Sequence, residues 1–129
     1  MSARILIVED NPLNLQLVRD ILEYRGHEII VATTVPEARD RLKEKPPQVV
    51  LLDIQLPGGG GESLLREIRN TPSIAELPVI AVTALAMRGD REKLLAIGFD
   101  GYLSKPIDTR IFGPTVESFL KGKGSIDAD

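Results

Sequence analysis

The sequence predicts a single α/β domain in which a parallel β-sheet is covered by helices on both faces. Short apolar runs alternate with helical patterns five times along the chain, which is typical of parallel strands joined by right-handed crossovers. The strongest runs are nearly unbroken stretches of Val, Ile and Leu, as expected for strands buried on both faces.

The predicted strands are all short. Residues 4–8, 49–52 and 78–82 are strong candidates, and residues 28–31 and 100–103 are weaker ones. In open sheets of this class, ligands bind beyond the carboxyl ends of the strands. The residues that directly follow each strand are therefore the first place to look for function.

The first predicted helix, residues 12–25, has clear boundary signals. Asn11 is a good N-cap, Pro12 suits the first turn, and Gly26 provides a stop. Four apolar side chains recur at helical spacing and predict one apolar face: Leu13, Leu17, Ile21 and Leu22.

Four further helices are predicted at residues 35–45, 61–70, 88–97 and 107–121. Pro46 and Pro47 end the first of these, and Gly98 stops the third. Gly113 and Pro114 fall inside the last one, where proline removes a backbone hydrogen bond. We expect a kink or break there, between Arg110 and Pro114.

Composition excludes several classes of function. The 129 residues suit one domain, expected at residues 1–121, with a polar and disordered tail at 122–129. The chain has no cysteine for a disulfide or thiolate metal site. A net charge of −3 does not suggest a nucleic-acid binder, and no apolar run approaches the roughly 20 residues of a membrane span. We expect a cytoplasmic protein that binds neither nucleic acid nor membrane.

Polar side chains follow every strong strand and one weaker strand. These residues are Glu9, Asp10, Asp53, Thr83 and Lys105. Three neighbouring carboxylates repel one another, and a divalent cation removes that penalty. Oxygen ligands favour Mg²⁺, so we expect Glu9, Asp10, Asp53 and the backbone carbonyl of Gln55 to bind this ion.

The same residues suit phosphoryl transfer. A carboxylate such as Asp53 can form an aspartyl phosphate. Lys105 and the Thr83 hydroxyl could then bind phosphoryl oxygens, and the small Ala84 leaves room for the incoming group. Taken singly, these residues are more simply a turn acid, a strand-end hydroxyl and a surface lysine. Their joint placement at the strand ends favours the functional interpretation.

Residues 4–121 resemble the CheY-like receiver domain of two-component response regulators. The matching stretches are residues 5–11, 51–57, 79–84 and 102–106. In detail, residues 9–14 and 83–90 are most similar to single-domain DivK-type regulators and to the receivers of hybrid histidine kinases.

This resemblance implies a role for each residue of the site. The residue matching Asp53 is phosphorylated, those matching Glu9 and Asp10 bind Mg²⁺, and those matching Thr83 and Lys105 engage the phosphoryl group. The chain is then a phosphoacceptor signalling domain rather than an enzyme with turnover, although such domains can catalyse their own phosphorylation and dephosphorylation.

The resemblance also implies a fold and a switch. The fold is a flavodoxin-like, doubly wound sheet of five strands in the order 2-1-3-4-5, with five helices. Tyr102 matches an aromatic switch, and the peptide bond between Lys105 and Pro106 is expected to be cis. Phosphorylation would bias the face made by the fourth helix, fifth strand and fifth helix.

Partners follow from the same resemblance. The phosphoryl source is a histidine kinase, a histidine phosphotransfer protein or both, and the output is a contact with a downstream protein. The chain is expected to be a monomer or a weak, phosphorylation-dependent dimer. No output domain is recognised in the 129 residues, and both a stand-alone regulator and a module of a larger protein stay open.

Three other interpretations remain as rivals. A metal-dependent phosphatase usually needs an acid where this chain has Gln55, and a flavodoxin needs a Ser/Thr-Gly loop in place of residues 9–12. A degenerate receiver would lack site residues that are present here. Residues 58–61 are four glycines, which we interpret as a flexible loop rather than a phosphate cradle. His27 is expected on the surface, in a turn.

Overall fold

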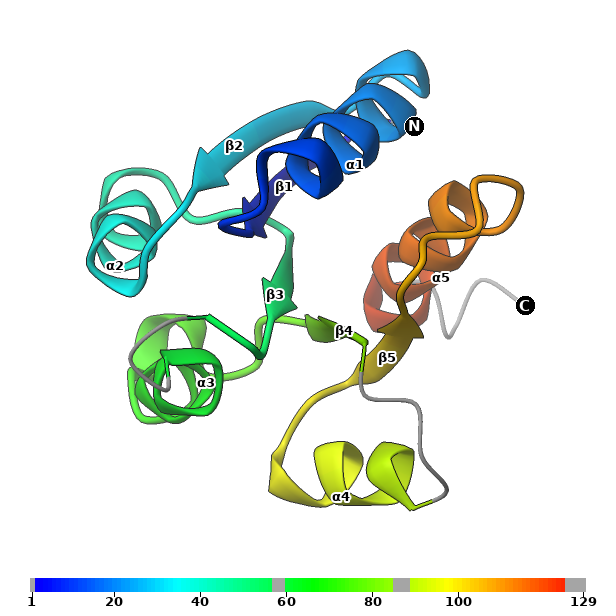
Figure 1. Ribbon diagram of the computed structural model, residues 1–129. Coiled ribbons are helices and arrows are strands. Elements are labelled where there is room, and N and C mark those ends of the chain that lie inside the picture. The colour runs from blue at the N-terminus through cyan, green and yellow to red at the C-terminus, as the bar shows by residue number, and fades with distance from the viewer. Residues whose placement is uncertain (1, 57–59, 85–88, 125–129) are drawn as a thin grey trace.

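The computed structural model describes residues 2–56, 60–84 and 89–124 and shows a parallel sheet with helices on both faces (Figure 1). The strands are β1 (Arg4–Val8), β2 (Glu28–Ala32), β3 (Val49–Asp53), β4 (Val79–Thr83) and β5 (Gly101–Ser104). The helices are α1 (Pro12–Tyr24), α2 (Val35–Glu44), α3 (Gly60–Arg69), the 3₁₀ turn η1 (Pro72–Ile74), α4 (Asp90–Ile97) and α5 (Phe112–Gly124).

The sheet has the order β2-β1-β3-β4-β5 with every neighbouring pair parallel, which confirms the expected fold class. The register places Asp53 opposite Val82, and the next residue, Thr83, opposite Ser104. The carboxyl ends of the three strands β3, β4 and β5 are therefore level with one another at one edge of the sheet.

The core lies in two layers, one on each face of the sheet. Alternate residues of β1 point to opposite layers: Ile5 and Ile7 pack with α1 and α5, whereas Leu6 and Val8 pack with α2, α3 and α4. All four side chains are buried. This arrangement explains the unbroken apolar runs, because a strand covered on both faces has no polar side.

The predicted apolar face of α1 is partly wrong. Leu13 is 82% exposed and Leu17 is 36% exposed, whereas Val18 and Leu22 are buried. Ile21 packs beside them, half-buried. Apolar residues occur on more than one side of this helix, so periodicity alone allows two choices of buried face. The sheet is contacted by the side that carries Val18 and Leu22.

The fifth helix begins at Phe112, five residues later than expected, and ends at Gly124, three residues past the expected boundary with the tail. Pro114 lies in its first turn, where a backbone N–H has no acceptor within the helix. The Thr115 N–H donates to the Ile111 carbonyl at 2.9 Å, which closes that turn. The helix therefore begins later than expected, and its described residues contain no break.

Two of the four consecutive glycines are tightly packed, so flexibility does not explain them. Gly60 and Gly61 are buried and open α3. A Cβ on Gly61 would lie 2.5 Å from the Ile54 Cα, and one on Gly60 would collide with the Val35 side chain. Glycine is needed at both positions because backbone and side chain approach too closely for a larger residue.

The surface position expected for His27 is also wrong, because the side chain is fully buried. The His27 Nδ1 accepts a hydrogen bond from the Ala3 N–H at 3.1 Å, so its Nε2 carries the proton that faces the Glu117 carboxylate at 2.8 Å. Arg25 binds the same carboxylate through two nitrogens, at 2.7 and 2.8 Å. A Cβ on Gly113 would collide with Arg25. This cluster fastens α5 to the turn between α1 and β2.

Parts of the sequence-based expectations lie outside the described residues. These parts are two glycines of the four-glycine run, residues 85–88 of the fourth-strand motif, and residues 125–129 of the tail. Within the part of the chain that the structure describes, no helix is both long and apolar enough to cross a membrane.

Candidate functional site

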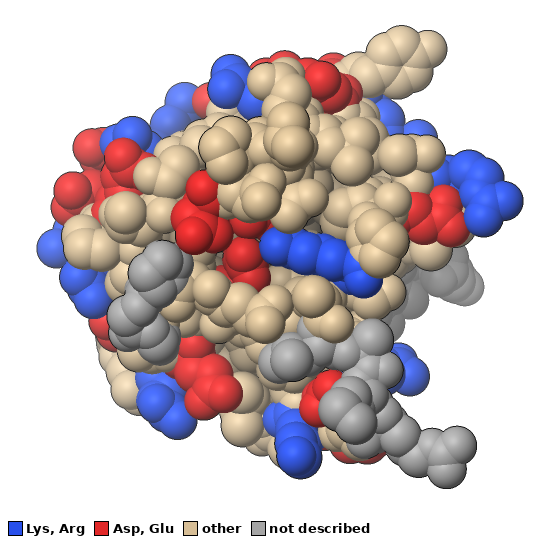
Figure 2. All heavy atoms as spheres, viewed as in Figure 1, with Lys and Arg blue, Asp and Glu red and all other residues tan. Residues whose placement is uncertain are grey.

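The carboxyl edge of the sheet brings four predicted site residues together. Glu9 and Asp10 follow β1, Asp53 is the last residue of β3, and Lys105 follows β5. Lys105 donates hydrogen bonds from Nζ to the Glu9 Oε1 at 3.0 Å and to the Asp53 Oδ2 at 3.1 Å. In the space-filling view, acidic side chains gather near the middle of the face shown, with a basic side chain beside them (Figure 2).

The two carboxylates that Lys105 binds are buried and held in place. Glu9 and Asp53 are each only 4% exposed. The remaining oxygen of Glu9 accepts the Asn11 N–H at 3.0 Å, and the remaining oxygen of Asp53 accepts the Gln55 N–H at 2.9 Å. Each carboxylate thus receives one backbone donor and one ammonium donor, which fixes its orientation before any ligand arrives.

Burial and charge act against each other in this site. Burial raises the pKa of Glu9 above its usual value, and the negative charge of Asp53 adds to this effect, although the Asn11 N–H and Lys105 oppose it. Partial burial alone would lower the pKa of Lys105, but its hydrogen bonds to Glu9 and Asp53 outweigh burial and raise it. Lys105 is therefore a permanent cation at neutral pH.

The three acids form a set that could hold a metal ion. One carboxylate oxygen each from Glu9, Asp10 and Asp53 lie within 4.8 Å of one another, and Asp10 is exposed at the mouth. All the donors are oxygen, which suits Mg²⁺. Lys105 is the one ammonium group that binds the two buried acids in the part of the chain that the structure describes, so three carboxylates leave an excess of negative charge here. The residues present therefore fit a divalent cation.

Thr83, Ala84 and Tyr102 complete the region. Thr83 is fully buried at the end of β4. It lies one residue beyond Val82, which pairs with Asp53 on β3. The Ala84 N–H points to the Gln55 Oε1 at 3.4 Å. Tyr102 on β5 is half-buried and packs against the core layer that contains α4.

The peptide bond between Lys105 and Pro106 is cis, as the resemblance implies.

Sequence reasoning missed two supporting contacts. Asn11 was expected to cap α1, and its side chain does accept the N–H groups of Leu13 and Asn14. That its own N–H also holds Glu9 has no signal in the sequence. The link from Gln55 to Ala84 joins two loops 29 residues apart, so no local pattern could reveal it.

Comparison with known proteins agrees with this geometry. A family model of the response regulator receiver domain matches residues 5–112. The chain is 41% identical over 120 residues to the polar-differentiation response regulator DivK of Brucella ovis, covering 93% of this chain and 98% of that protein.

Solved structures show the same likeness. A putative response regulator from Chloroflexus aurantiacus superposes with a TM-score of 0.86 at 25% identity, covering 93% of this chain and 98% of that one. A CheY-like receiver domain protein from Methanospirillum hungatei superposes with a TM-score of 0.82 at 29% identity, covering 95% and 97%.

Proposed function

The chain belongs to the response-regulator receiver family, and on that premise we propose that Asp53 accepts a phosphoryl group from a phosphohistidine of a partner protein. The partner is a histidine kinase or a histidine phosphotransfer protein, and the exchange takes place in the cytoplasm. The phosphorylated domain then signals through contact with a downstream protein.

In the proposed reaction, a carboxylate oxygen of Asp53 attacks the phosphorus atom. The new P–O bond forms as the P–N bond to the histidine breaks, and the electron pair of that bond stays on the imidazole nitrogen. No general base is required, because a carboxylate nucleophile has no proton to give up as it attacks. The chain's own contribution is position and charge: the Gln55 N–H orients Asp53, and Lys105 offers an ammonium group to a phosphoryl oxygen.

The proposed metal ligands are Glu9, Asp10, Asp53 and the backbone carbonyl of Gln55. Bound Mg²⁺ would supply positive charge for the phosphoryl oxygens and cancel repulsion among the acids. Thr83 would bind a further phosphoryl oxygen through its hydroxyl group.

One observation carries the proposal: Asp53 is a buried carboxylate at a strand end, paired with a lysine and adjacent to two further acids. A structural ion pair would need one acid for one lysine. Here two buried acids bind one ammonium group and a third acid offers an oxygen within 4.8 Å of theirs, which is a costly arrangement unless a cation and a phosphoryl group use it.

The proposed output is a shift in the face formed by α4, β5 and α5. Thr83 and Tyr102 lie on adjacent strands, and the register pairs Thr83 with Ser104, two residues after Tyr102. A movement of the Thr83 hydroxyl toward the phosphoryl group would change the space available to Tyr102. Such a change biases an existing equilibrium between two states.

Intact-mass measurement after incubation with acetyl phosphate and Mg²⁺ tests the proposal. We expect one added phosphoryl group on the wild-type chain, none on Asp53→Asn, and none when the metal is chelated. Asp40→Asn, which changes an exposed aspartate on α2, is the matched control and should react normally. An adduct on Asp53→Asn would place the acceptor elsewhere, and no adduct on the wild-type chain would favour a degenerate receiver.

A further inference from the structure

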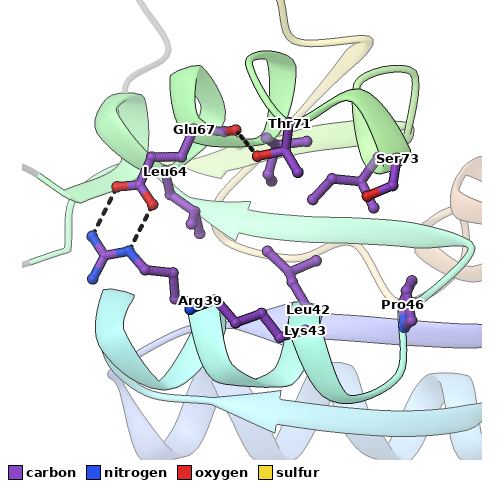
Figure 3. A pocket seen from close by; sticks show the side chains of 10 residues that line it. Arg39, Leu42, Lys43, Pro46, Leu64, Glu67, Thr71 and Ser73 are labelled. Atoms are coloured by element: carbon purple, nitrogen blue, oxygen red, sulfur yellow. Dashed lines mark hydrogen bonds and ion pairs between the residues drawn. The ribbon is translucent and has the colours of Figure 1, made fainter.

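A second site of a different character lies between α2 and α3, separate from the acidic edge of the sheet. It is a pocket of about 330 Å³ (Figure 3). None of the acidic site residues lines it. Its volume falls at the lower end of the range of roughly 300–1,000 Å³ found for small-molecule sites.

The floor of this pocket is apolar and comes from the core. Leu42 of α2 and Leu64 of α3 enter it from opposite sides, and both are buried (Figure 3). Ile68 is also buried, and Ile74 is half-buried at the end of η1. A ligand with an apolar part would remove this surface from water and gain the free energy of that burial.

The rim carries an excess of positive charge. Arg39 binds both oxygens of Glu67, at 2.6 and 2.8 Å. These hydrogen bonds lower the pKa of Glu67, and the nearby Lys43 ammonium adds to the effect. Lys43 is exposed and makes no hydrogen bond or ion pair with the rest of the described chain. The Glu67 carboxylate is thus already satisfied, and Lys43 is left as a cation above an apolar floor.

We propose that the pocket between α2 and α3 binds a small amphipathic carboxylate, with its apolar part on the floor and its carboxylate group paired with Lys43. The charge of the rim selects an anion over an amine. The apolar floor selects a molecule with a hydrocarbon part over a simple inorganic anion. An apolar pocket with a few polar groups at its edge is the usual design of such sites.

The proposal is independent of phosphorylation, because the two sites share no residue. Octanoate is a suitable probe, titrated into the full chain and followed by NMR of the leucine and isoleucine methyl groups. We expect saturable shifts at the methyl groups of the floor. Acetate, which has no apolar part, and octylamine, which has the opposite charge, should produce much weaker shifts. Asp53→Asn should bind octanoate like the wild-type chain.

Two variants make the test specific. Lys43→Glu changes an exposed side chain that makes no hydrogen bond in the described chain, so the fold should be unaffected, and octanoate should bind at least about tenfold more weakly. Lys93→Glu makes the same charge change on α4, outside the pocket, and should leave binding unchanged. Ser73→Trp should fill the pocket from its rim and abolish binding. Shifts that do not saturate, equal binding of octylamine, or full affinity in Lys43→Glu would each overturn the proposal.

Discussion

Replacing Lys105 by methionine tests the charge balance of the acidic site directly. The ammonium group pairs with Glu9 at 3.0 Å and with Asp53 at 3.1 Å. Methionine has a similar length and no charge, so the variant removes both ion pairs while retaining much of the packing. The two carboxylates, each 4% exposed, then face each other without a counter-charge.

The magnitude follows from the separation of the carboxylates. Their closest metal-ligand oxygens lie within 4.8 Å. Two unit charges at that distance repel by about 3.5 kcal/mol at an effective dielectric constant of about 20. Uptake of a proton relieves part of this repulsion, so we expect Lys105→Met to lose about 2–3 kcal/mol of unfolding free energy at pH 7.5.

The dependence on pH has a definite sign. The pKa of Glu9 is raised in the folded state, so the folded chain holds this proton more tightly than the unfolded chain. That contribution to stability is complete below the usual pKa of a glutamate and is lost as the pH rises through the raised value. Because Lys105 opposes this rise in the wild-type chain, its loss raises the pKa of Glu9 further in Lys105→Met. The variant then gains more stability than the wild-type chain as the pH falls, and its deficit should shrink between pH 7.5 and pH 5.

Urea denaturation followed by circular dichroism, without metal, provides the assay. Adding Glu9→Gln to Lys105→Met should recover most of the roughly 2–3 kcal/mol lost, by removing the repulsion. In the wild-type chain, Glu9→Gln also breaks the ion pair with Lys105. The gain in unfolding free energy should therefore be smaller there than in Lys105→Met. Lys93→Met on α4 controls for loss of a lysine. The reasoning fails if Lys105→Met is as stable as the wild-type chain, or if the double variant is less stable than the single one.

Three further predictions concern the metal, the cluster beneath α5 and the start of α3. Mg²⁺ at ten times its dissociation constant should stabilise the chain by about 1.4 kcal/mol in thermal unfolding, and Asp10→Asn should weaken that response without lowering stability in a chelator, because Asp10 is exposed and its charge repels the other two acids. Glu117→Ala leaves the buried His27 donor without an acceptor and should cost about 1–3 kcal/mol at pH 7. Because the pKa of Glu117 is lowered to about 2, its contribution should disappear as the pH falls from about 4.5 toward that value, and denaturation across this range would show it. Gly61→Ala would place a Cβ 2.5 Å from the Ile54 Cα and should cost about 1–3 kcal/mol in urea denaturation; an unchanged midpoint would show that the backbone yields there.

The sheet and its acidic edge could be predicted because both depend on local patterns. A strand buried on both faces has a recognisable apolar run, and the next residue must lie at the edge of the sheet. Glu9 follows such a run and Asp53 ends one, whereas Lys105 follows the weaker strand β5. Parallel strands then bring their side chains together without any knowledge of long-range contacts.

The sequence-based predictions are wrong where contacts between distant parts of the chain decide whether a side chain is buried. His27 follows Gly26 in a turn, and the local pattern therefore indicates a surface residue. In the fold its ring is buried and hydrogen-bonded to Glu117, which lies 90 residues further along the chain. The same holds for Leu13, since only the position of α1 on the sheet shows that this face of the helix is exposed.

Charge accounting links the acidic site to its proposed switch. Three carboxylates and the Lys105 ammonium leave the site with two net negative charges when all are ionised. A divalent cation would cancel that charge. Phosphorylation would replace the single charge of Asp53 with roughly two, so the site would again be negative and would need further donors. The Thr83 hydroxyl and the Ala84 N–H lie at the end of the neighbouring strand β4, where such donors are required. Drawing them toward the phosphoryl group would disturb the end of β4, where Thr83 pairs with Ser104 of β5, and a change of charge at one edge of the sheet would reach the proposed output face through β5.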